Sequence, residues 1–275
     1  MTPLLKSSAV IKPSLIQNLA GICGRTWRLF ATAISFSAFG VGGIILWLLI
    51  FPCLHMLVWQ PTKRVRYARA IIRYTFRGFI GLMHFLGVLR YQIIGQEKLA
   101  RQGLLLLANH PSLIDTVFLM AFVEHADCIV KSGLWNNLFT RGPVRAAGYI
   151  NNEQGTELLD ACIATLRAGN NLIIFPEGTR TPANGEIKLK RGAANIAVRG
   201  LRDLTPVVIN CKPQTLGKGV PWWQIPERQV QFTIEVKEDI PIQAFTGTGD
   251  SEVIAARHLT EFLQQYFIQE KAHHA

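Results

Sequence analysis

The sequence has few cysteines and few charged residues. Its five cysteines (Cys23, Cys53, Cys128, Cys162 and Cys211) are odd in number and scattered, and no C-x-x-C pair occurs. This pattern excludes a disulfide scaffold, predicts a reducing compartment and gives no reason to expect a metal site. Charged residues make up 17% of the 275 residues and apolar residues 49%, which is little charge for a water-soluble protein.

Signatures of nucleic-acid binding are also missing. No zinc finger, helix-turn-helix or aromatic RNA-binding motif occurs, so the formal charge of +11 does not predict a nucleic-acid partner. A basic surface of this kind favours other anions, such as phosphate headgroups or an acidic carrier.

One long segment, residues 29–62, contains no Lys, Arg, Asp or Glu. A membrane-spanning helix needs about 20 apolar residues, so this segment is long enough. Gly40, Gly42 and Gly43 in its middle leave two interpretations open: one tilted helix over roughly residues 27–50, or two shorter helices that bend at the glycines and re-enter one leaflet. A cleavable signal peptide is a poor match, because the apolar run starts late and has no small-residue cleavage site.

Basic residues flank this segment on both sides, which suits the re-entrant form. If the segment spans the membrane, the heavier cluster after it places the C-terminal part in the cytoplasm. We therefore expect an inner-membrane protein with its large C-terminal domain facing the cytoplasm. As a helix, residues 64–90 would carry Arg on one side and Ile, Phe and Leu on the other. This pattern predicts an amphipathic helix that lies at the lipid surface or packs on the domain.

From about residue 89 apolar strand-like runs alternate with helix-like stretches. This order predicts an α/β domain with a central, largely parallel sheet flanked by helices. We divide the chain into N-terminal membrane-anchoring helices at 1–88 and a catalytic domain at 89–275. The predicted strands are LRYQIIG, GLLLLAN, DCIVK, NLIIFP, TPVVIN and VQFTIEV, and the predicted helices cover 112–125, 153–168, 191–201 and 251–269.

The stretch NHPSLID follows the buried run GLLLLA and is the first candidate site. Pro111 suits the first turn of a helix, which places His110 at the helix entrance and Asp115 about one turn inside. His and Asp five positions apart meet only if His110 lies on the loop and folds back. If they meet, the imidazole can act as a general base that the carboxylate orients. The alternative is a helix cap without catalysis.

The stretch FPEGTR repeats this arrangement after the run NLII. Gly178 permits a tight turn, and Glu177 and Arg180 emerge at the carboxyl end of a strand, where ligands of parallel sheets gather. Arg180 can clamp a phosphate or carboxylate. A Glu–Arg ion pair that stiffens the loop is the alternative.

NHPSLID together with FPEGTR resembles the glycerolipid acyltransferase superfamily, which includes the 1-acyl-sn-glycerol-3-phosphate acyltransferases. The resemblance covers roughly residues 89–240. It includes IVKSGLWNNLFTRGPVRAAGYI with Lys131, LKRGAANIAV after FPEGTR, and LTPVVI.

The resemblance implies that His110 deprotonates an acceptor hydroxyl and that Asp115 orients it. The hydroxyl would attack an acyl thioester of coenzyme A or acyl carrier protein, with no metal or bound cofactor. The second motif, Glu177, Gly178, Thr179 and Arg180, would hold the acceptor, a lysophospholipid or another hydroxylated lipid. Backbone N–H groups near Gly178 or Gly192 are candidate donors to the oxyanion.

One position departs from the family pattern. Asn152 stands where the family has an Arg that binds the acceptor phosphate. Either Arg141, Arg145 or Lys190 supplies the charge, or the acceptor lacks a phosphate there, as in a specialised lipid or polyene pathway. Lysophosphatidate is the favoured acceptor, with phosphatidate as product.

Two other functions remain open. One is a catalytically idle module that binds membrane or acyl carrier protein. The other is a thioesterase in which water replaces the acceptor. No G-x-S-x-G elbow occurs, which argues against a serine hydrolase.

Overall fold

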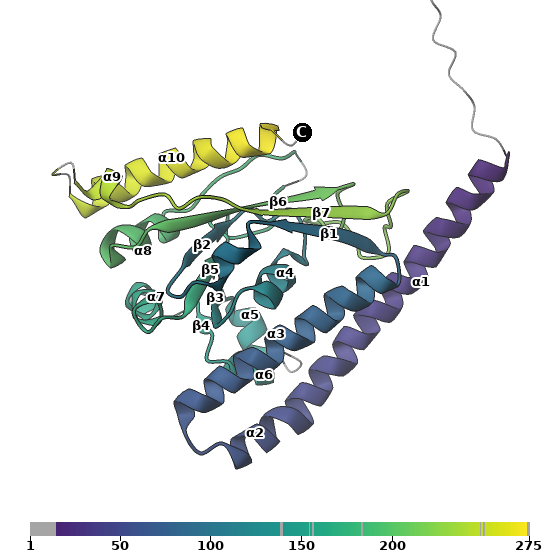
Figure 1. Cartoon of the computed structure of the whole chain (residues 1–275), viewed down its shortest axis with the longest axis horizontal. Helices are drawn as coiled ribbons and strands as arrows, with labels where there is room; N and C mark the ends of the chain where they lie inside the picture. Colours follow the sequence, from purple (N-terminus) through teal and green to yellow (C-terminus); the bar gives the residue numbers. More distant parts are fainter. Residues whose placement is uncertain are drawn as a thin grey trace, which may run out of the picture.

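The computed structural model describes residues 15–137, 140–153, 155, 157–182, 184–247, 249 and 251–273. Its centre is a seven-stranded sheet with the order β1-β7-β6-β2-β5-β3-β4, and helices lie on both faces (Figure 1). The strands are β1 Leu89–Ile94, β2 Leu105–Ala108, β3 Ala126–Val130, β4 Ile150–Asn151, β5 Asn171–Ile174, β6 Leu204–Lys212 and β7 Val230–Val236.

Strand direction decides where the strand ends meet. β6, β2, β5, β3 and β4 run parallel to one another, and β7 pairs antiparallel with β6 while β1 pairs parallel with β7. The predicted α/β fold with a largely parallel sheet is thus confirmed. The carboxyl ends of β2, β5 and β6 lie together at one edge, hereafter the carboxyl edge.

The side chains of β2 are all apolar because helices pack against both faces of the sheet at this strand. Leu106 and Ala108 pack into one core cluster with helices α3 and α4, whereas Leu105 and Leu107 pack into a second cluster with α7, α8 and α10. A strand buried on both faces has no polar side, as expected for parallel strands. The helices are α3 Pro61–Phe85, α4 Asp115–Phe122, α5 Ser132–Asn136, α6 Arg141–Ala146, α7 Glu157–Arg167, α8 Gly192–Gly200, α9 Gln243–Thr246 and α10 Glu252–His273.

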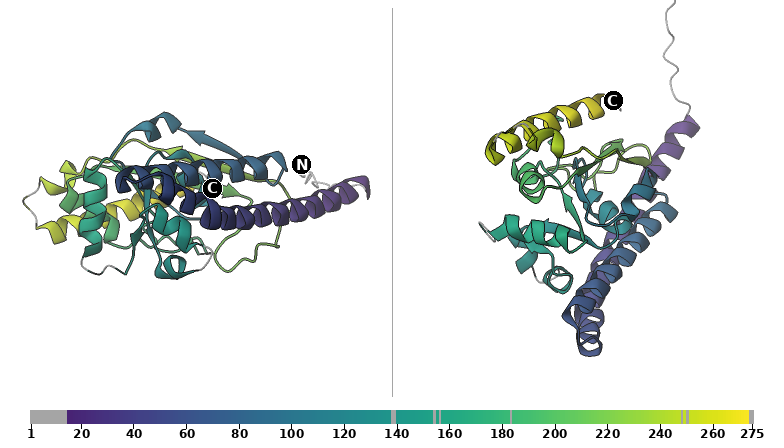
Figure 2. Two further views of the ribbon diagram at one scale, coloured as in Figure 1. Left: turned by 90° about the horizontal axis from the view of Figure 1, so that it is seen from below. Right: turned by 60° about the vertical axis from the view of Figure 1, so that its left-hand side comes forward.

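The N-terminal apolar segment forms one arm of a helical hairpin. α1 (Leu15–Ile45) continues through a short π-helical turn at Leu46–Ile50 into α2 (Phe51–Leu57), and α3 returns beside it (Figure 2). The chain stays helical at its central glycines, so the bend at the glycines, one of the two interpretations left open, does not occur. The reversal falls at residues 58–60, directly before Pro61, whose missing N–H is tolerated at a helix start.

The described chain contains one helix, Gly21–Leu57, that is long and apolar enough to cross a membrane. Many of its large apolar side chains are exposed in the structure, among them Trp27, Phe30, Leu48, Met56 and Leu57. One side of α1 packs on α3 through Phe39, whose ring lies 4.9 Å from that of Phe79, and on the domain through Phe36, whose ring lies 6.4 Å from that of Trp222. The hairpin therefore has one face on the domain and another without a protein partner in the structure.

A buried ion pair ties the hairpin to the sheet. Arg69 of α3 donates to Asp127 of β3 over 2.7 Å and to the carbonyl of Ala147 over 2.9 Å. Thr165 of α7 also donates to Asp127. Both charged side chains are almost fully buried, so this contact fixes the position of α3 against β3.

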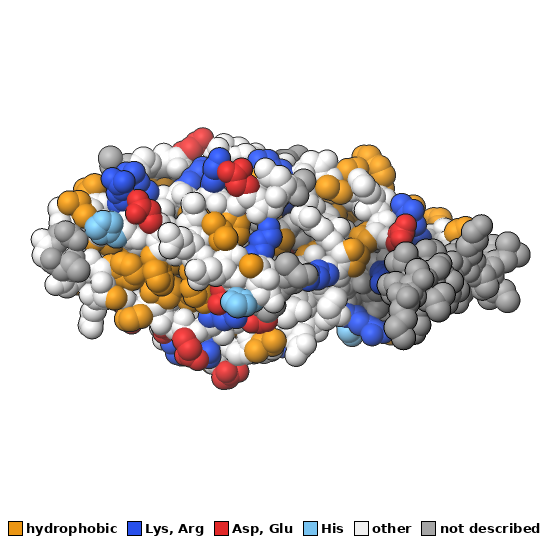
Figure 3. All heavy atoms as spheres, turned by 90° about the horizontal axis from the view of Figure 1, so that it is seen from above, with side chains coloured by type: hydrophobic (Ala, Val, Ile, Leu, Met, Phe, Trp, Pro, Cys, Tyr) orange, Lys and Arg blue, Asp and Glu red, His pale blue; other side chains and the backbone are white. Residues whose placement is uncertain are grey.

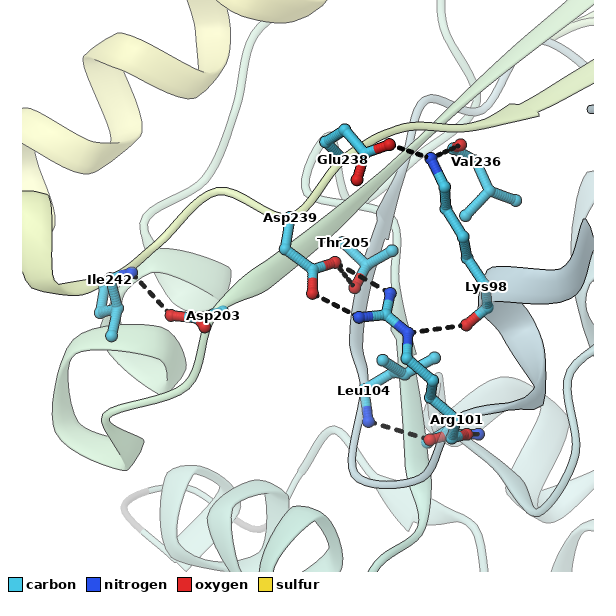
Figure 4. Close-up of polar contacts among 10 residues, drawn as sticks. Lys98, Arg101, Leu104, Asp203, Thr205, Val236, Glu238, Asp239 and Ile242 are labelled. Carbon is cyan, nitrogen blue, oxygen red and sulfur yellow. Dashed lines mark hydrogen bonds and ion pairs between the residues drawn. The ribbon is translucent and has the colours of Figure 1, made fainter. Parts of the chain in front are cut away.

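A second polar network fastens the opposite edge of the sheet (Figure 4). It joins the 3-10 turn Gln96–Ala100 to the segment after β7. Arg101 donates to both carboxylate oxygens of Asp239, and Lys98 pairs with Glu238. Thr205, at the start of β6, donates to Asp239. These contacts hold the two segments together at the edge of the sheet opposite the carboxyl edge.

Three local details differ from the sequence-based expectation. α4 begins at Asp115, three residues later than predicted, because the segment after Pro111 forms a turn in which the Ser112 N–H donates to the Asp115 carboxylate. The two-residue strand β4 is absent from the prediction, as are the short helices α5 and α6. Elements this short carry too little periodicity to be read from the sequence.

Candidate active site

The central feature of the carboxyl edge is a contact between His110 and Asp115. His110 lies on the loop after β2, and its Nδ1 is 3.0 Å from Oδ2 of Asp115 at the start of α4. Because α4 starts only at Asp115, the loop can fold back over its first turn. A proton on Nδ1 shared with the carboxylate leaves Nε2 as the nitrogen that can accept a proton.

Asp115 is fully buried, whereas 14% of the His110 side chain is exposed. Burial raises the pKa of Asp115 from 3.8 to about 6, although hydrogen bonds from His110 and Ser112 counteract this rise. Its second oxygen, Oδ1, is buried and has no hydrogen-bond partner among the residues that the structure describes. The carboxylate is therefore directed at the imidazole in a site that water does not reach.

Glu177 joins the two loops that carry the motifs. Its Oε1 accepts from the His110 backbone N–H and from the Thr181 hydroxyl, both over 2.9 Å. The Thr181 N–H donates in turn to the His110 carbonyl over 2.7 Å. Burial raises the pKa of Glu177. Its contacts thus set the position of the His110 backbone, and the Glu–Arg ion pair considered for this loop does not form, because Arg180 turns elsewhere.

Further side chains fix the imidazole, and the sequence alone did not point to them. The Phe175 ring stacks on the His110 ring with centroids 4.2 Å apart. Asn109 exchanges two hydrogen bonds with the backbone of Ile209 in β6. Phe175 and Asn109 lie inside the two motifs, but only the fold shows which neighbours they contact.

Arg180 is directed at the segment between β6 and β7. Its Nη1 donates to the carbonyls of Leu216 and Gly217 over 2.9 and 2.8 Å. The backbone N–H of Leu113, near the dyad, also donates to the Leu216 carbonyl. Arg180 thus connects FPEGTR to residues 213–217 with one nitrogen, and its guanidinium has further donors.

Lys190 lies over the turn of FPEGTR. A Cβ at Gly178, where φ is +68°, would lie 2.9 Å from Cε and Nζ of Lys190. The Lys190 N–H donates to the Pro176 carbonyl, and the Gly178 N–H donates to the Phe175 carbonyl. The Gly178 N–H is therefore engaged, which removes it from the candidate oxyanion donors. Thr179 lies half-buried on the same turn.

The other expected residues gather at the ends of β3 and β4. Exposed Lys131 directly follows β3, and the Asn152 Oδ1 accepts from the Ser132 N–H over 3.0 Å. Arg145 lies over the Trp135 ring and Arg141 over the Trp47 ring. Of the cations considered as substitutes for the family's arginine, the contacts place Lys190 at FPEGTR, whereas Arg141 and Arg145 lie on α6.

Comparisons with known proteins find similarity to acyltransferases. A family model described as Acyltransferase matches residues 90–210. A Caenorhabditis elegans protein named "Putative 1-acyl-sn-glycerol-3-phosphate acyltransferase acl-2" is 30% identical over 192 residues, 66% of this chain and 65% of that protein. A Pseudomonas aeruginosa 1-acyl-sn-glycerol-3-phosphate acyltransferase is 29% identical over 157 residues, 54% of this chain and 59% of that enzyme. The alignments thus span less than two thirds of either relative.

The fold is similar to a solved structure. The crystal structure of the 1-acyl-sn-glycerophosphate (LPA) acyltransferase PlsC from Thermotoga maritima aligns with a TM-score of 0.65. The match covers 89% of this chain and 98% of that one, at 19% identity. At this identity the likeness concerns the fold.

Proposed function

Because this chain belongs to the glycerolipid acyltransferase superfamily, we propose that it is a membrane-bound O-acyltransferase. It moves an acyl group from a thioester to the hydroxyl of a lipid. The observation that carries the proposal is the contact of His110 with the fully buried Asp115 at the carboxyl edge.

The reaction needs one proton acceptor that later becomes a donor. Nε2 of His110 takes the proton of the acceptor hydroxyl while that oxygen attacks the thioester carbonyl. The tetrahedral intermediate then collapses, the carbon–sulfur bond breaks, and the leaving thiolate takes the proton from the imidazolium. The products are an ester and a thiol, with no metal or cofactor in the balance.

Asp115 assists by stabilising the imidazolium and keeping Nδ1 protonated. This role requires the ionised carboxylate. Since burial lifts the pKa of Asp115 to about 6, catalysis declines as the pH falls through that value. Glu177 and Phe175 act as positioning residues, because they contact the backbone and ring of His110.

The favoured acceptor is lysophosphatidate. Two curated relatives carry the name 1-acyl-sn-glycerol-3-phosphate acyltransferase, and Lys190 brings a positive charge to the turn at Gly178. In this proposal Lys190 and the remaining donors of Arg180 bind the acceptor phosphate, with Thr179 beside them. Lys131 and Arg145 lie further along the edge.

A phosphate-free acceptor is the alternative, and Asn152 is the observation that favours it. Asn152 is neutral, exposed and hydrogen-bonded to Ser132. Asn152→Arg then provides a test: it raises kcat/KM for lysophosphatidate if the missing charge limits binding. Unchanged kinetics mean that Lys190 and Arg180 already supply the charge.

The hairpin is the proposed membrane anchor, on residues 1–88, with the catalytic domain on 89–275. Its exposed apolar side chains would lie in lipid, and the cluster of Arg and Lys in α3 supports a location of the domain on the cytoplasmic side of the inner membrane. An anchor of this kind keeps the domain at the surface that supplies its lipid acceptor.

The test is acyl transfer by detergent-purified full-length protein beside His110→Ala. Labelled acyl-CoA and acyl carrier protein are the donors, and lysophosphatidate or a phosphate-free hydroxylated lipid is the acceptor. His258→Ala, an exposed position on α10, is the matched control. Transfer is expected to be lost with His110→Ala alone. Transfer that survives in His110→Ala would refute the assignment of the base, and hydrolysis without transfer would indicate a thioesterase.

A further inference from the structure

A large basic cleft adjoins the segment that Arg180 contacts and takes no part in the mechanism above. Its volume is about 870 Å³, and it lies between the start of α1 and the segment 212–229 that connects β6 to β7. Its lining includes four cationic side chains, Arg25, Lys212, Lys218 and Arg228, and a single carboxylate, Glu227. Two elements far apart in the sequence thus combine into one positively charged hollow.

The walls of the cleft are fixed from both ends. At one end the carbonyls of Leu216 and Gly217 accept from Arg180, so Gly217 both lines the cleft and contacts the FPEGTR loop. At the other end Arg28 of α1 donates to the carbonyls of Pro226 and Glu227. The cleft is therefore preformed, and it begins at the carboxyl edge.

Three of the four cations of this cleft carry a charge that no carboxylate of the described residues pairs with. In the part of the chain that the structure describes, Arg25, Lys218 and Arg228 are exposed and have no carboxylate within ion-pair distance. On the face seen in Figure 3, basic and acidic side chains lie interspersed. Like charges gathered in a hollow raise the local concentration of anions.

We propose that this cleft binds the phosphate groups of coenzyme A when acyl-CoA is the donor. The proposal rests on the proposed function and adds to it the class of donor and the residues that hold it. Arg228 and Arg25 can bind phosphate bidentately and Lys218 as a point charge. Because a flexible pantetheine arm separates the thioester from the phosphates, their site must flank the dyad without overlapping it.

The shape of the cleft favours a small anion over an acidic carrier protein. Small-molecule sites are concave and have volumes of about 300–1,000 Å³, and this cleft lies in that range. A carrier protein would contact a broad surface, which the hollow does not offer. Anionic lipid headgroups are the other phosphate source, and the experiment separates them.

The experiment measures binding of coenzyme A itself, without an acyl group, to full-length protein in detergent by calorimetry. Lys218→Glu combined with Arg228→Glu is compared with the control Arg199→Glu combined with Arg257→Glu, which makes the same change of charge on α8 and α10. We expect at least about tenfold weaker binding in the cleft variant, since it loses two charge-assisted contacts to phosphate, and no change in the control. Two milder changes guard against a misfolded variant. Lys218→Gln combined with Arg228→Gln should weaken the binding of coenzyme A less than the double Glu variant does. Wild-type protein should likewise bind coenzyme A without its 3′-phosphate more weakly than intact coenzyme A, but by a smaller factor.

Kinetics give a second readout. The preference of the enzyme for acyl-CoA over acyl-pantetheine, which lacks the nucleotide, should shrink about tenfold in the cleft variant. Equal affinity for coenzyme A in all proteins refutes the proposal. So does a defect confined to vesicles of anionic lipid or to acyl carrier protein. If wild-type protein binds coenzyme A but shows no acyl transfer, the proposed function is refuted and the cleft assignment stays intact.

Discussion

Replacing Asp115 by Asn is expected to make the protein more stable and inactive at once. The substitution keeps the shape of the side chain and removes a charge that is fully buried. In the folded protein this charge is unfavourable, because burial raises the pKa of the carboxyl from 3.8 to about 6. Function requires the charge, since a neutral amide cannot stabilise the imidazolium of His110.

The magnitude follows from the two pKa values. A raised folded pKa means that the contribution of this group to stability is complete below about pH 4 and is lost as the pH rises through about 6. At about 1.4 kcal/mol per pH unit, ionised Asp115 costs about 3 kcal/mol at neutral pH. The difference in unfolding free energy between Asp115→Asn and wild type should therefore grow by about that amount from pH 4 to pH 8.

The assay is urea unfolding in detergent at a series of pH values, beside acyl transfer. Transfer should fall by about 10⁴-fold, as when an orienting carboxylate is replaced by an amide that favours the wrong tautomer. Asp239→Asn is the control with the opposite sign, because its hydrogen bond from Arg101 lowers the pKa of Asp239; the wild type should gain stability over this variant as the pH rises. If Asp115→Asn is less stable than wild type at pH 8, the raised pKa is refuted.

Three further predictions concern positions around the site. Arg69→Met should lower the unfolding free energy by about 3–5 kcal/mol in urea titrations, because it leaves Asp127 charged and buried; a loss below about 1 kcal/mol would mean that water reaches the pair. Gly178→Ala should cost about 1–2 kcal/mol of stability through its φ of +68° and raise the KM for lysophosphatidate by displacing Lys190; an unchanged KM would exclude Lys190 from the acceptor site. Phe175→Leu should lower kcat without changing KM for either substrate, because the imidazole loses the ring stacked against it and about 0.5–1.5 kcal/mol of aromatic contact; an unchanged kcat would show that the hydrogen bonds suffice to orient the base.

The sequence by itself determined six of the seven strands, the order of motifs and the long apolar N-terminal segment. Local chemistry is enough for these features: a short run such as LLLLA between turn residues favours a strand buried on both faces, and NHPSLID and FPEGTR each follow such a run. Parallel strands then bring their carboxyl ends to one edge, which is why His110 and Glu177 could be expected near each other.

Only the tertiary structure decided which partners these residues have. The periodicity of a helix says nothing of where it begins, so the start of α4 at Asp115, on which the contact with His110 depends, came from the folded loop. Glycine lowers helix propensity by about 1 kcal/mol, yet α1 remains helical through three central glycines, and the chain reverses before Pro61 instead. Arg180 reaches Leu216, and Arg28 reaches Pro226 and Glu227. These contacts join residues far apart in sequence, so their charges and carbonyls meet only after the sheet has set the distances between the loops.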